Sequence, residues 1–109
     1  MLEHNGTVYW LPSLHWKGVD LRQRLESKIG VPVILENDAN AAALGEKWMG
    51  AGRDVDNLVL LTLGTGIGGG FLFDGRMYRG AHNFGAEIGH FTVDPAGPLC
   101  ACGERGHWE

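Results

Sequence analysis

Short hydrophobic segments separated by turn residues predict a series of small α/β elements in the first part of the chain. An extended apolar run at residues 7–11 follows an Asn-Gly pair and stops at Pro12, which indicates a strand. Leucine and isoleucine then recur at every fourth position up to Ile29, which gives one apolar face of a helix. Asp20 is placed to cap the start of this helix, and Gly30 is placed to end it.

The next apolar run leads into a conspicuously polar junction. Residues 31–35 are short, apolar and β-branched, so they predict a buried strand of the kind found in parallel sheets. The chain continues as E-N-D-A-N at 36–40, and an alanine-rich helix is expected over 39–49. Open α/β sheets bind ligands at the carboxyl ends of their strands. Asn37 and Asp38 are therefore either ligand-facing groups or simple helix caps, and the two roles do not exclude each other.

The second half of the chain has the pattern of an antiparallel hairpin. Residues 50–57 are rich in glycine and charge and are expected to connect two lobes. A hydrophobic strand at 58–63, a glycine-rich turn, a second strand, an Asp-Gly turn and a third strand follow. The turn G-T-G-I-G-G-G at 64–70 lacks the Lys-Ser/Thr of a Walker A loop, and no helix follows it as in a Rossmann fold. Hairpin geometry would explain these glycines, and so would close approach of backbone N–H groups to a phosphate.

Composition indicates the size class, the kinds of partner and the cellular location of the protein, but says little about its chemistry. The chain has 109 residues, of which 44% are hydrophobic and 20% charged, as in one domain or a piece of a larger one. A net charge of −4 without a basic run argues against a nucleic-acid partner for this stretch. No apolar segment is long enough for a membrane span, and no signal-peptide pattern is present, so a reduced cytoplasmic location is expected. Because the sequence stops at Glu109 directly after a loop, we expect a fragment of a longer protein.

Potential metal ligands cluster near the end of the sequence, at His90, Cys100, Cys102 and His107. Imidazole nitrogen and thiolate sulfur are zinc ligands, and four of them close a structural site. A disulfide between two cysteines separated by one residue would be strained, whereas the glycines around them supply the turns a metal loop needs. Two free thiols and two surface histidines remain the alternative, because the usual Cys-x-x-Cys knuckle is absent.

Two motifs resemble the ROK family of sugar kinases and sugar-responsive repressors. They are G-A-E-I-G-H at 85–90 and C-A-C-G-E-R-G-H-W-E at 100–109. His107 stands where the family usually has a third cysteine, and histidine is also a good zinc ligand. The resemblance implies an α/β fold of the actin-like, RNase H-like sugar-kinase type. Within it, residues 1–53 would end the N-terminal lobe and residues 54–109 would begin the C-terminal lobe.

The resemblance also implies an activity, the ATP-dependent phosphorylation of a hexose, with Asp38 as the catalytic base. The implied sugar-binding residues are Asn37, Asp38, Glu87, His90 and Glu109. The glycine turn matches the second phosphate motif of the superfamily, and its implied nucleotide contacts are Gly64, Thr65, Gly66 and Gly68. The implied zinc ligands are His90, Cys100, Cys102 and His107. Ser13 stands where many kinases of the family have asparagine, and it is either a sugar contact or a loop residue.

The implied cofactors are ATP, Mg²⁺ and a structural Zn²⁺, and the full-length protein is expected to be a homo-oligomer. A sugar-responsive repressor with an upstream helix-turn-helix is the alternative, although Asp38 and the intact glycine turn favour a kinase. The family's D-x-G-x-T phosphate motif and its adenosine-binding helical region are not found in these residues. We therefore do not expect the 109 residues to be active alone. The identity of the hexose cannot be inferred, because all hexoses present similar hydroxyls.

Overall fold

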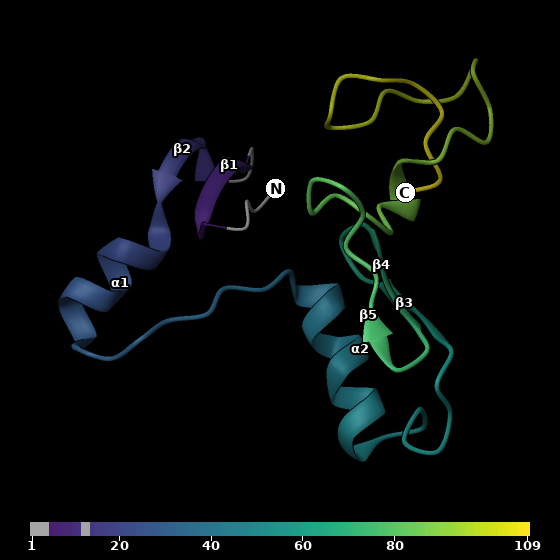
Figure 1. Ribbon diagram of the computed structural model, residues 1–109. Helices are drawn as coiled ribbons and strands as arrows, with labels where there is room; N and C mark the ends of the chain where they lie inside the picture. The colour runs from purple at the N-terminus through teal and green to yellow at the C-terminus, as the bar shows by residue number, and fades with distance from the viewer. Residues whose placement is uncertain (1–4, 12–13) are drawn as a thin grey trace.

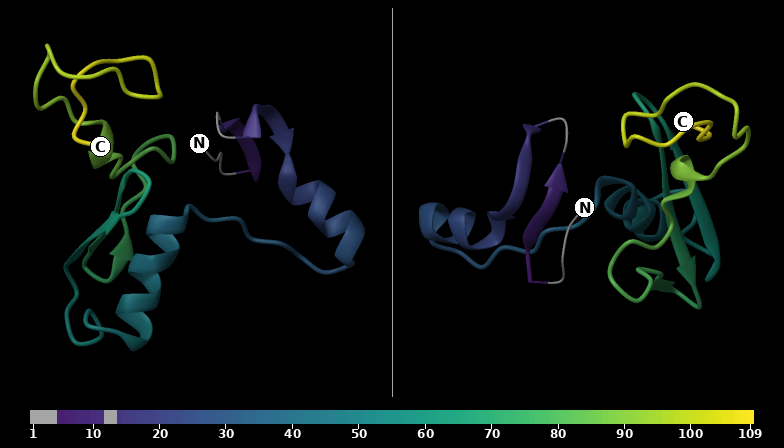
Figure 2. Two further views of the ribbon diagram at one scale, coloured as in Figure 1. Left: turned by 180° about the vertical axis from the view of Figure 1, so that it is seen from behind. Right: turned by 90° about the horizontal axis from the view of Figure 1, so that it is seen from above.

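The computed structural model describes residues 5–11 and 14–109 of the chain. The break expected at Pro12 and the family position expected at Ser13 lie outside the described residues. Figures 1 and 2 both show two groups of elements that an extended segment joins. No helix within the described ranges is long and apolar enough to cross a membrane.

The first group is an antiparallel pair of strands followed directly by a helix. Strands β1 (Thr7–Leu11) and β2 (Trp16–Asp20) pair with each other, and α1 (Leu21–Ile29) comes next. The Asp20 side chain accepts a backbone N–H of the first helical turn at 3.1 Å, and Gly30 ends the helix with a φ of 71°. The predicted strand at 7–11 and the predicted helix are thus confirmed. Strand β2 was not predicted, because glycine and charged residues interrupt its apolar pattern.

The buried strand predicted at residues 31–35 is wrong. This segment is an extended connection to the next helix, and the side chains of Val31 and Ile34 are 54% and 94% exposed. A strand needs a neighbour that pairs with its backbone N–H and C=O groups, and no described strand runs beside this segment. The N–H of Val33 donates instead to the carboxylate of Glu26 at 3.0 Å. The apolar run is therefore a hydrophobic surface that the described part of the chain leaves open.

The second group is a helix on a three-stranded antiparallel sheet. Helix α2 (Asp38–Met49) packs on β3 (Leu58–Leu63) and β4 (Ile67–Phe73), and β5 (Arg76–Met77) completes the strand order β3-β4-β5. The Asp-Gly turn before β5 has φ values of 50° and 72°, which are typical of a type I′ hairpin turn. The predicted helix, hairpin and third strand are therefore confirmed.

The glycines of β4 let α2 lie directly against the sheet. A side-chain carbon at Gly70 would lie 2.5 Å from the carbonyl oxygen of Ala39 and 2.7 Å from the Cβ of Ala43. A side-chain carbon at Gly68 would meet Thr62 and Ala39. Both alanines are buried, with exposed fractions of 2% and 0%. The missing side chains thus create the space that the helix occupies.

The assignment of residues 1–53 and 54–109 to two lobes stays a prediction. Helix α2 precedes residue 53, yet it packs on β3 and β4, which follow it. The pair β1–β2 and helix α1 lie apart from this second group in both figures.

The remainder of the chain returns to the end of the sheet. The 3₁₀ helix η2 (Ile88–His90) follows a connection that contains several glycines, and it contacts β4. The following loop at 91–109 is closed by backbone bridges, which pair Thr92 with His107 and Leu99 with Arg105. This loop carries three of the four predicted metal ligands and Glu109.

Candidate functional site

A cleft of about 400 Å³ opens between the start of α2 and the turn that joins β3 to β4. Its walls come from four separate parts of the sequence, namely the start of α2, the glycine turn, the residue before η2 and the end of the last loop. They include all the predicted sugar and nucleotide residues except His90, that is, Asn37, Asp38, Gly64, Thr65, Gly66, Gly68, Glu87 and Glu109. The structure therefore brings together residues that the sequence places up to 72 positions apart, from Asn37 to Glu109 (109 − 37 = 72).

At the start of α2, two neighbouring polar residues line the cleft, and the first of them caps the helix. The Oδ1 atom of Asn37 accepts the backbone N–H groups of Ala39 at 2.9 Å and Asn40 at 3.2 Å, so Asn37 is the N-cap. Asp38 is the first residue of the helix and remains exposed on the cleft wall. Its Oδ1 atom also accepts the backbone N–H of Ala39 at 2.9 Å. Asp38 thus presents a charged oxygen to whatever occupies the cleft.

The glycines at 64–70 have two different structural roles. Gly68 and Gly70 lie within β4 and make room for α2, as described above. Gly64 and Gly66 form the tight turn itself, in which the Gly64 N–H donates to the Gly66 carbonyl oxygen at 3.0 Å. A side-chain carbon at Gly64 would meet no atom within 4 Å, whereas one at Gly66 would lie 2.5 Å from the carboxylate of Glu109. Gly66 therefore permits close approach of an acidic group to the turn.

Glu109 connects the glycine turn with the metal-ligand cluster. Its Oε2 atom accepts the backbone N–H of Ile67 at 3.2 Å. Its Oε1 atom accepts the thiol of Cys100 at 3.5 Å and lies 3.6 Å from Nε2 of His90. Its own N–H donates to the carbonyl oxygen of Gly89 at 3.0 Å, which fixes the backbone beside η2. The side chain is thus shared between the cleft and the cluster.

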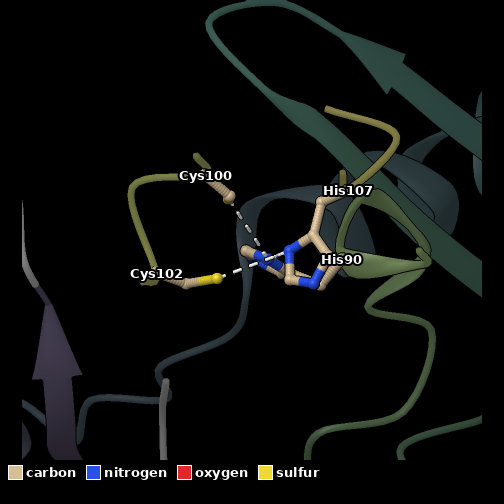
Figure 3. A group of neighbouring side chains, drawn as sticks. All are labelled: His90, Cys100, Cys102 and His107. Atoms are coloured by element: carbon tan, nitrogen blue, oxygen red, sulfur yellow. Dashed lines mark hydrogen bonds between the residues drawn. The ribbon is translucent and has the colours of Figure 1, made fainter. Parts of the chain in front are cut away.

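The four predicted metal ligands converge, with one donor atom from each lying within 4.8 Å of the others. Figure 3 shows ring nitrogens of His90 and His107 and the sulfur of Cys102 facing one another. The two Nδ1 atoms are 3.2 Å apart, Cys102 Sγ is 3.4 Å from His107 Nδ1, and Cys100 Sγ is 3.9 Å from His90 Nδ1. Tetrahedral zinc with ordinary bond lengths has edges of roughly 3.3 Å between nitrogens and roughly 3.6 Å between nitrogen and sulfur. The donor set and its spacing therefore fit a zinc ion.

His90 can serve both sites because its two ring nitrogens face different neighbours. Its Nδ1 atom points to the cluster, and its Nε2 atom faces the Glu109 carboxylate that borders the cleft. The side chain itself does not line the cleft. A metal ion on Nδ1 would leave Nε2 protonated and fixed in direction, as is usual when a second group orients a ligating histidine.

Glycine conformations shape the loop around the cluster. Gly103 and Gly106 have φ values of 102° and 69°, a region that side-chain-bearing residues rarely adopt. The Gly103 N–H donates to the Cys100 carbonyl oxygen at 3.0 Å, and the Cys100 N–H donates to the Glu104 carbonyl oxygen at 2.7 Å. This compact turn holds the two cysteine side chains close to the histidines.

Electrostatics at the cluster favour a bound cation. A hydrogen bond from the backbone of Cys102 acts to lower the pKa of the Cys100 thiol. Desolvation and the neighbouring Cys102 and Glu109 side chains outweigh it, so the pKa of Cys100 is raised. A thiolate at Cys100 therefore needs a positive partner, and a divalent metal supplies one.

Sequence reasoning missed an ion pair beside the cleft, between Glu36 and Arg79. The Nε atom of Arg79 donates to Oε2 of Glu36 at 3.2 Å, and its Nη2 atom donates to the same oxygen. The only sequence signal is the acidic residue directly before Asn37. Nothing in the sequence pairs it with an arginine 43 positions later.

Comparison with known proteins defines the class to which this architecture belongs. The family model described as ROK family matches residues 1–109. A ROK family glucokinase from Streptomyces griseus, solved in complex with glucose and AMPPNP, superposes with a TM-score of 0.93 at 43% identity. The match covers 99% of this chain and 35% of that one. The chain therefore belongs to the ROK family, and it is part of a domain with the α/β, actin-like fold of the family's sugar kinases, as expected.

Relatives with different functions match almost equally well. The glucokinase of Thermotoga maritima is 52% identical over 103 residues, which are 94% of this chain and 32% of that protein. The xylose repressor of Bacillus subtilis is 40% identical over 109 residues, which are 100% of this chain and 28% of the repressor. A ROK family transcriptional regulator homologous to the Escherichia coli Mlc protein superposes with a TM-score of 0.82 at 38% identity. It is covered to 26%, and this chain to 96%. The chain thus spans about a third of the length of the relatives it matches.

Proposed function

We propose that this chain is the sugar- and phosphate-facing part of an ATP-dependent hexose kinase. The observation that carries the proposal is the single cleft in which Asp38 lies together with the glycine turn, Glu87 and Glu109. A carboxylate at a helix start, backbone N–H groups of a tight turn and further acidic side chains are the groups that phosphoryl transfer to a polyol requires.

In the proposed reaction, a hexose hydroxyl attacks the γ-phosphorus of ATP. The new O–P bond forms as the bond from phosphorus to the β–γ bridging oxygen breaks, and the hydroxyl proton passes to Asp38. Backbone N–H groups at the turn formed by Gly64 and Gly66 would face the phosphate oxygens, with Thr65 adding a hydroxyl. The remaining sugar hydroxyls would be held by Asn37, Glu87, His90 and Glu109. Because Oδ1 of Asn37 is engaged in the helix cap, its amide NH₂ is the group suited to a hydroxyl oxygen.

The proposed zinc ligands are His90, Cys100, Cys102 and His107. When bound, the metal would close a four-ligand structural site without an open position for water. The role of the chain's own residues is to orient His90, whose Nε2 atom lies on the side of the sugar-facing Glu109. Magnesium would accompany ATP, and we assign no protein ligand to it within these residues.

The glucokinase relatives support the assignment as a kinase, but each of them is about three times as long as this chain. The glucokinases compared above are 43–52% identical to this chain, and the S. griseus glucokinase holds glucose and the ATP analogue AMPPNP in its structure. Because the chain covers about a third of these relatives, the activity would belong to a longer chain that supplies the rest of the nucleotide site. We place that protein in the cytoplasm, where the thiols of the metal loop stay reduced, and expect it to act as a homo-oligomer.

A sugar-responsive transcriptional repressor is the second candidate. The B. subtilis xylose repressor aligns with all 109 residues, and the Mlc-related regulator shares the fold. Such a protein would bind a sugar in the same cleft without turnover. Asp38 on the cleft wall and the intact glycine turn favour the kinase, because phosphoryl transfer needs a proton acceptor and donors that face the phosphates.

The test is to incubate the full-length protein with ATP, Mg²⁺ and a panel of hexoses and to detect the sugar phosphate directly. A kinase produces it, and Asp38→Asn suppresses it while sugar binding, measured by calorimetry, persists. A protein that binds a hexose, forms no sugar phosphate and releases operator DNA when the hexose is added would instead be a repressor.

A further inference from the structure

The ion pair between Glu36 and Arg79 joins two segments that lead to different lining residues of the cleft. Glu36 immediately precedes Asn37 and Asp38, and Arg79 begins the connection that ends at Glu87. The ion pair therefore connects the chain segments that carry Asp38 and Glu87, while neither of its members lines the cleft itself.

The Glu36 carboxylate is fully engaged by four donor groups. Oε1 accepts the backbone N–H of Asn37 at 3.0 Å and the Nδ2 group of Asn40 at 3.1 Å. Oε2 accepts both Nε and Nη2 of Arg79. The side chain is 18% exposed. A charge-assisted, two-pronged contact in a partly buried place is directional and stronger than an exposed ion pair.

On the α2 side, this carboxylate fixes the backbone that carries the proposed sugar ligands. The N–H that it holds belongs to Asn37, whose own side chain caps α2. It also sets the orientation of the Asn40 amide, which is 5% exposed and whose Oδ1 atom has no partner among the described groups. The reversed orientation would turn that oxygen towards the carboxylate. Glu36 thus determines how the first turn of α2 enters the cleft.

On the other side, Arg79 anchors a tight loop. Its carbonyl oxygen accepts the N–H of Gly85 at 2.9 Å, and a side-chain carbon at Gly85 would lie 2.8 Å from the Arg79 carbonyl carbon. The loop closes on itself and delivers the chain directly to Glu87. Movement of Arg79 would therefore move this wall of the cleft.

We propose that Glu36 and Arg79 are positioning residues whose ion pair sets the distance between the two sugar-facing walls. The proposal rests on the proposed function of the cleft. Neither side chain touches the reacting atoms, and both act through the backbone of the residues beside them. Because phosphoryl transfer to a hydroxyl depends on alignment, loosening this link should affect the sugar more than the nucleotide.

The experiment compares Glu36→Gln and Arg79→Met with Arg22→Met in the full-length protein. Arg22 forms an exposed ion pair with Glu26 on α1, at 3.8 Å, so its replacement is a matched control for losing an arginine. We expect the two cleft variants to lower kcat/KM for the hexose about 10- to 100-fold, since small misplacements remote from the chemistry have effects of that size. The KM for ATP should stay within about twofold, and bound zinc should be unchanged. Arg79→Lys, which keeps the charge, should recover part of the loss.

Two results would overturn the positioning role while leaving the kinase assignment intact. One is a hexose kcat/KM equal to that of Arg22→Met. The other is an equal loss of kcat/KM for hexose and for ATP, which would indicate a purely structural role. A parent protein that neither binds nor phosphorylates any hexose would reject both the proposed function and this inference.

Discussion

Glu109 accepts the backbone N–H of Ile67 through the oxygen atom that lies over Gly66. A carboxylate from the metal loop therefore occupies a backbone donor of the glycine turn. In a kinase, the same donor would face a phosphate oxygen, and two anions cannot share it without repulsion. In the proposed kinase, the sugar, the nucleotide and the loop at 91–109 would therefore be coupled at the Glu109 side chain.

The first prediction concerns the proposed base. Asp38→Asn in the full-length protein should lower kcat by about 10² to 10⁴-fold, because the hydroxyl proton loses its acceptor. Hexose affinity should change little, since the asparagine side chain has the same shape and Asn37 remains the helix cap. Steady-state kinetics and a calorimetric sugar titration measure the two effects separately. A kcat of Asp38→Asn within a few-fold of the parent value would show that Asp38 is not the catalytic base.

The second prediction concerns the turn. Gly66→Val should raise the KM for ATP, because the new side chain would block approach to the turn and displace the Glu109 carboxylate. Since Glu109 also faces the proposed sugar site, some loss of hexose affinity is expected as well. Gly64→Ala provides the comparison, because its Cβ would meet nothing within 4 Å, and its effect should be smaller. Loss of sugar affinity with an unchanged KM for ATP would show that the turn does not contact the nucleotide.

The third prediction concerns the metal. The purified full-length protein should contain one zinc ion for each set of ligands formed by His90, Cys100, Cys102 and His107. Cys102→Ala should release it and weaken hexose binding, because His90 loses its fixed orientation. His107→Cys should retain the metal, since it restores a common zinc ligand. Metal analysis and sugar titration of each variant measure the two effects. Zinc loss with unchanged sugar affinity would show that the metal site does not influence sugar binding.

The fourth prediction concerns the contact between helix and sheet. Gly70→Ala should lower the free energy of unfolding by about 1–3 kcal/mol, because its Cβ would overlap the backbone of Ala39 and the side chain of Ala43. Gly45→Ala, on α2 itself, is the control. Its Cβ meets nothing within 4 Å, and alanine should stabilise the helix by about 0.5–1 kcal/mol. Denaturant unfolding of the two variants should therefore give changes of opposite sign.

The fifth prediction concerns pH. Partial burial acts to raise the pKa of Glu36, but hydrogen bonds from Asn40, Arg79 and the backbone, with the charge of Arg79, together hold that pKa below its ordinary value of 4.5. A carboxylate with a lowered folded pKa stabilises the protein above its unfolded pKa, and the stabilisation is lost as the pH falls through the folded pKa. The melting temperature of the parent should therefore exceed that of Glu36→Gln at neutral pH. The gap should narrow as the pH falls below 4.5, and a gap that does not depend on pH would contradict this account.

Local patterns predicted most of the elements whose hydrogen-bond partners are near in sequence, although β2 was missed because glycine and charged residues interrupt its apolar pattern. Helix α1 with its Asp20 cap and the β3–β4 hairpin carry complete signals within a few residues. Residues 31–35 do not, since a strand depends on a neighbour that the pattern cannot supply. The same limit applies to the site. The resemblance of the motifs singled out eight residues that line one cleft and four potential metal ligands that converge, and their roles stay predictions, whereas the pairing of Glu36 with Arg79 depends on folding alone.

The absence of side chains at Gly68 and Gly70 of β4 has a further consequence for how precisely the start of α2 is positioned. Where a helix rests on leucines or phenylalanines, rotamer changes can shift it while the packing remains acceptable. Here the alanines of α2 pack directly on the backbone of Gly68 and Gly70. The separation between helix and strand is therefore a van der Waals contact distance that no change of rotamer can alter. The distance between Asp38 and the glycine turn is consequently set by the backbone. Substitutions in the surrounding side chains would leave it unchanged.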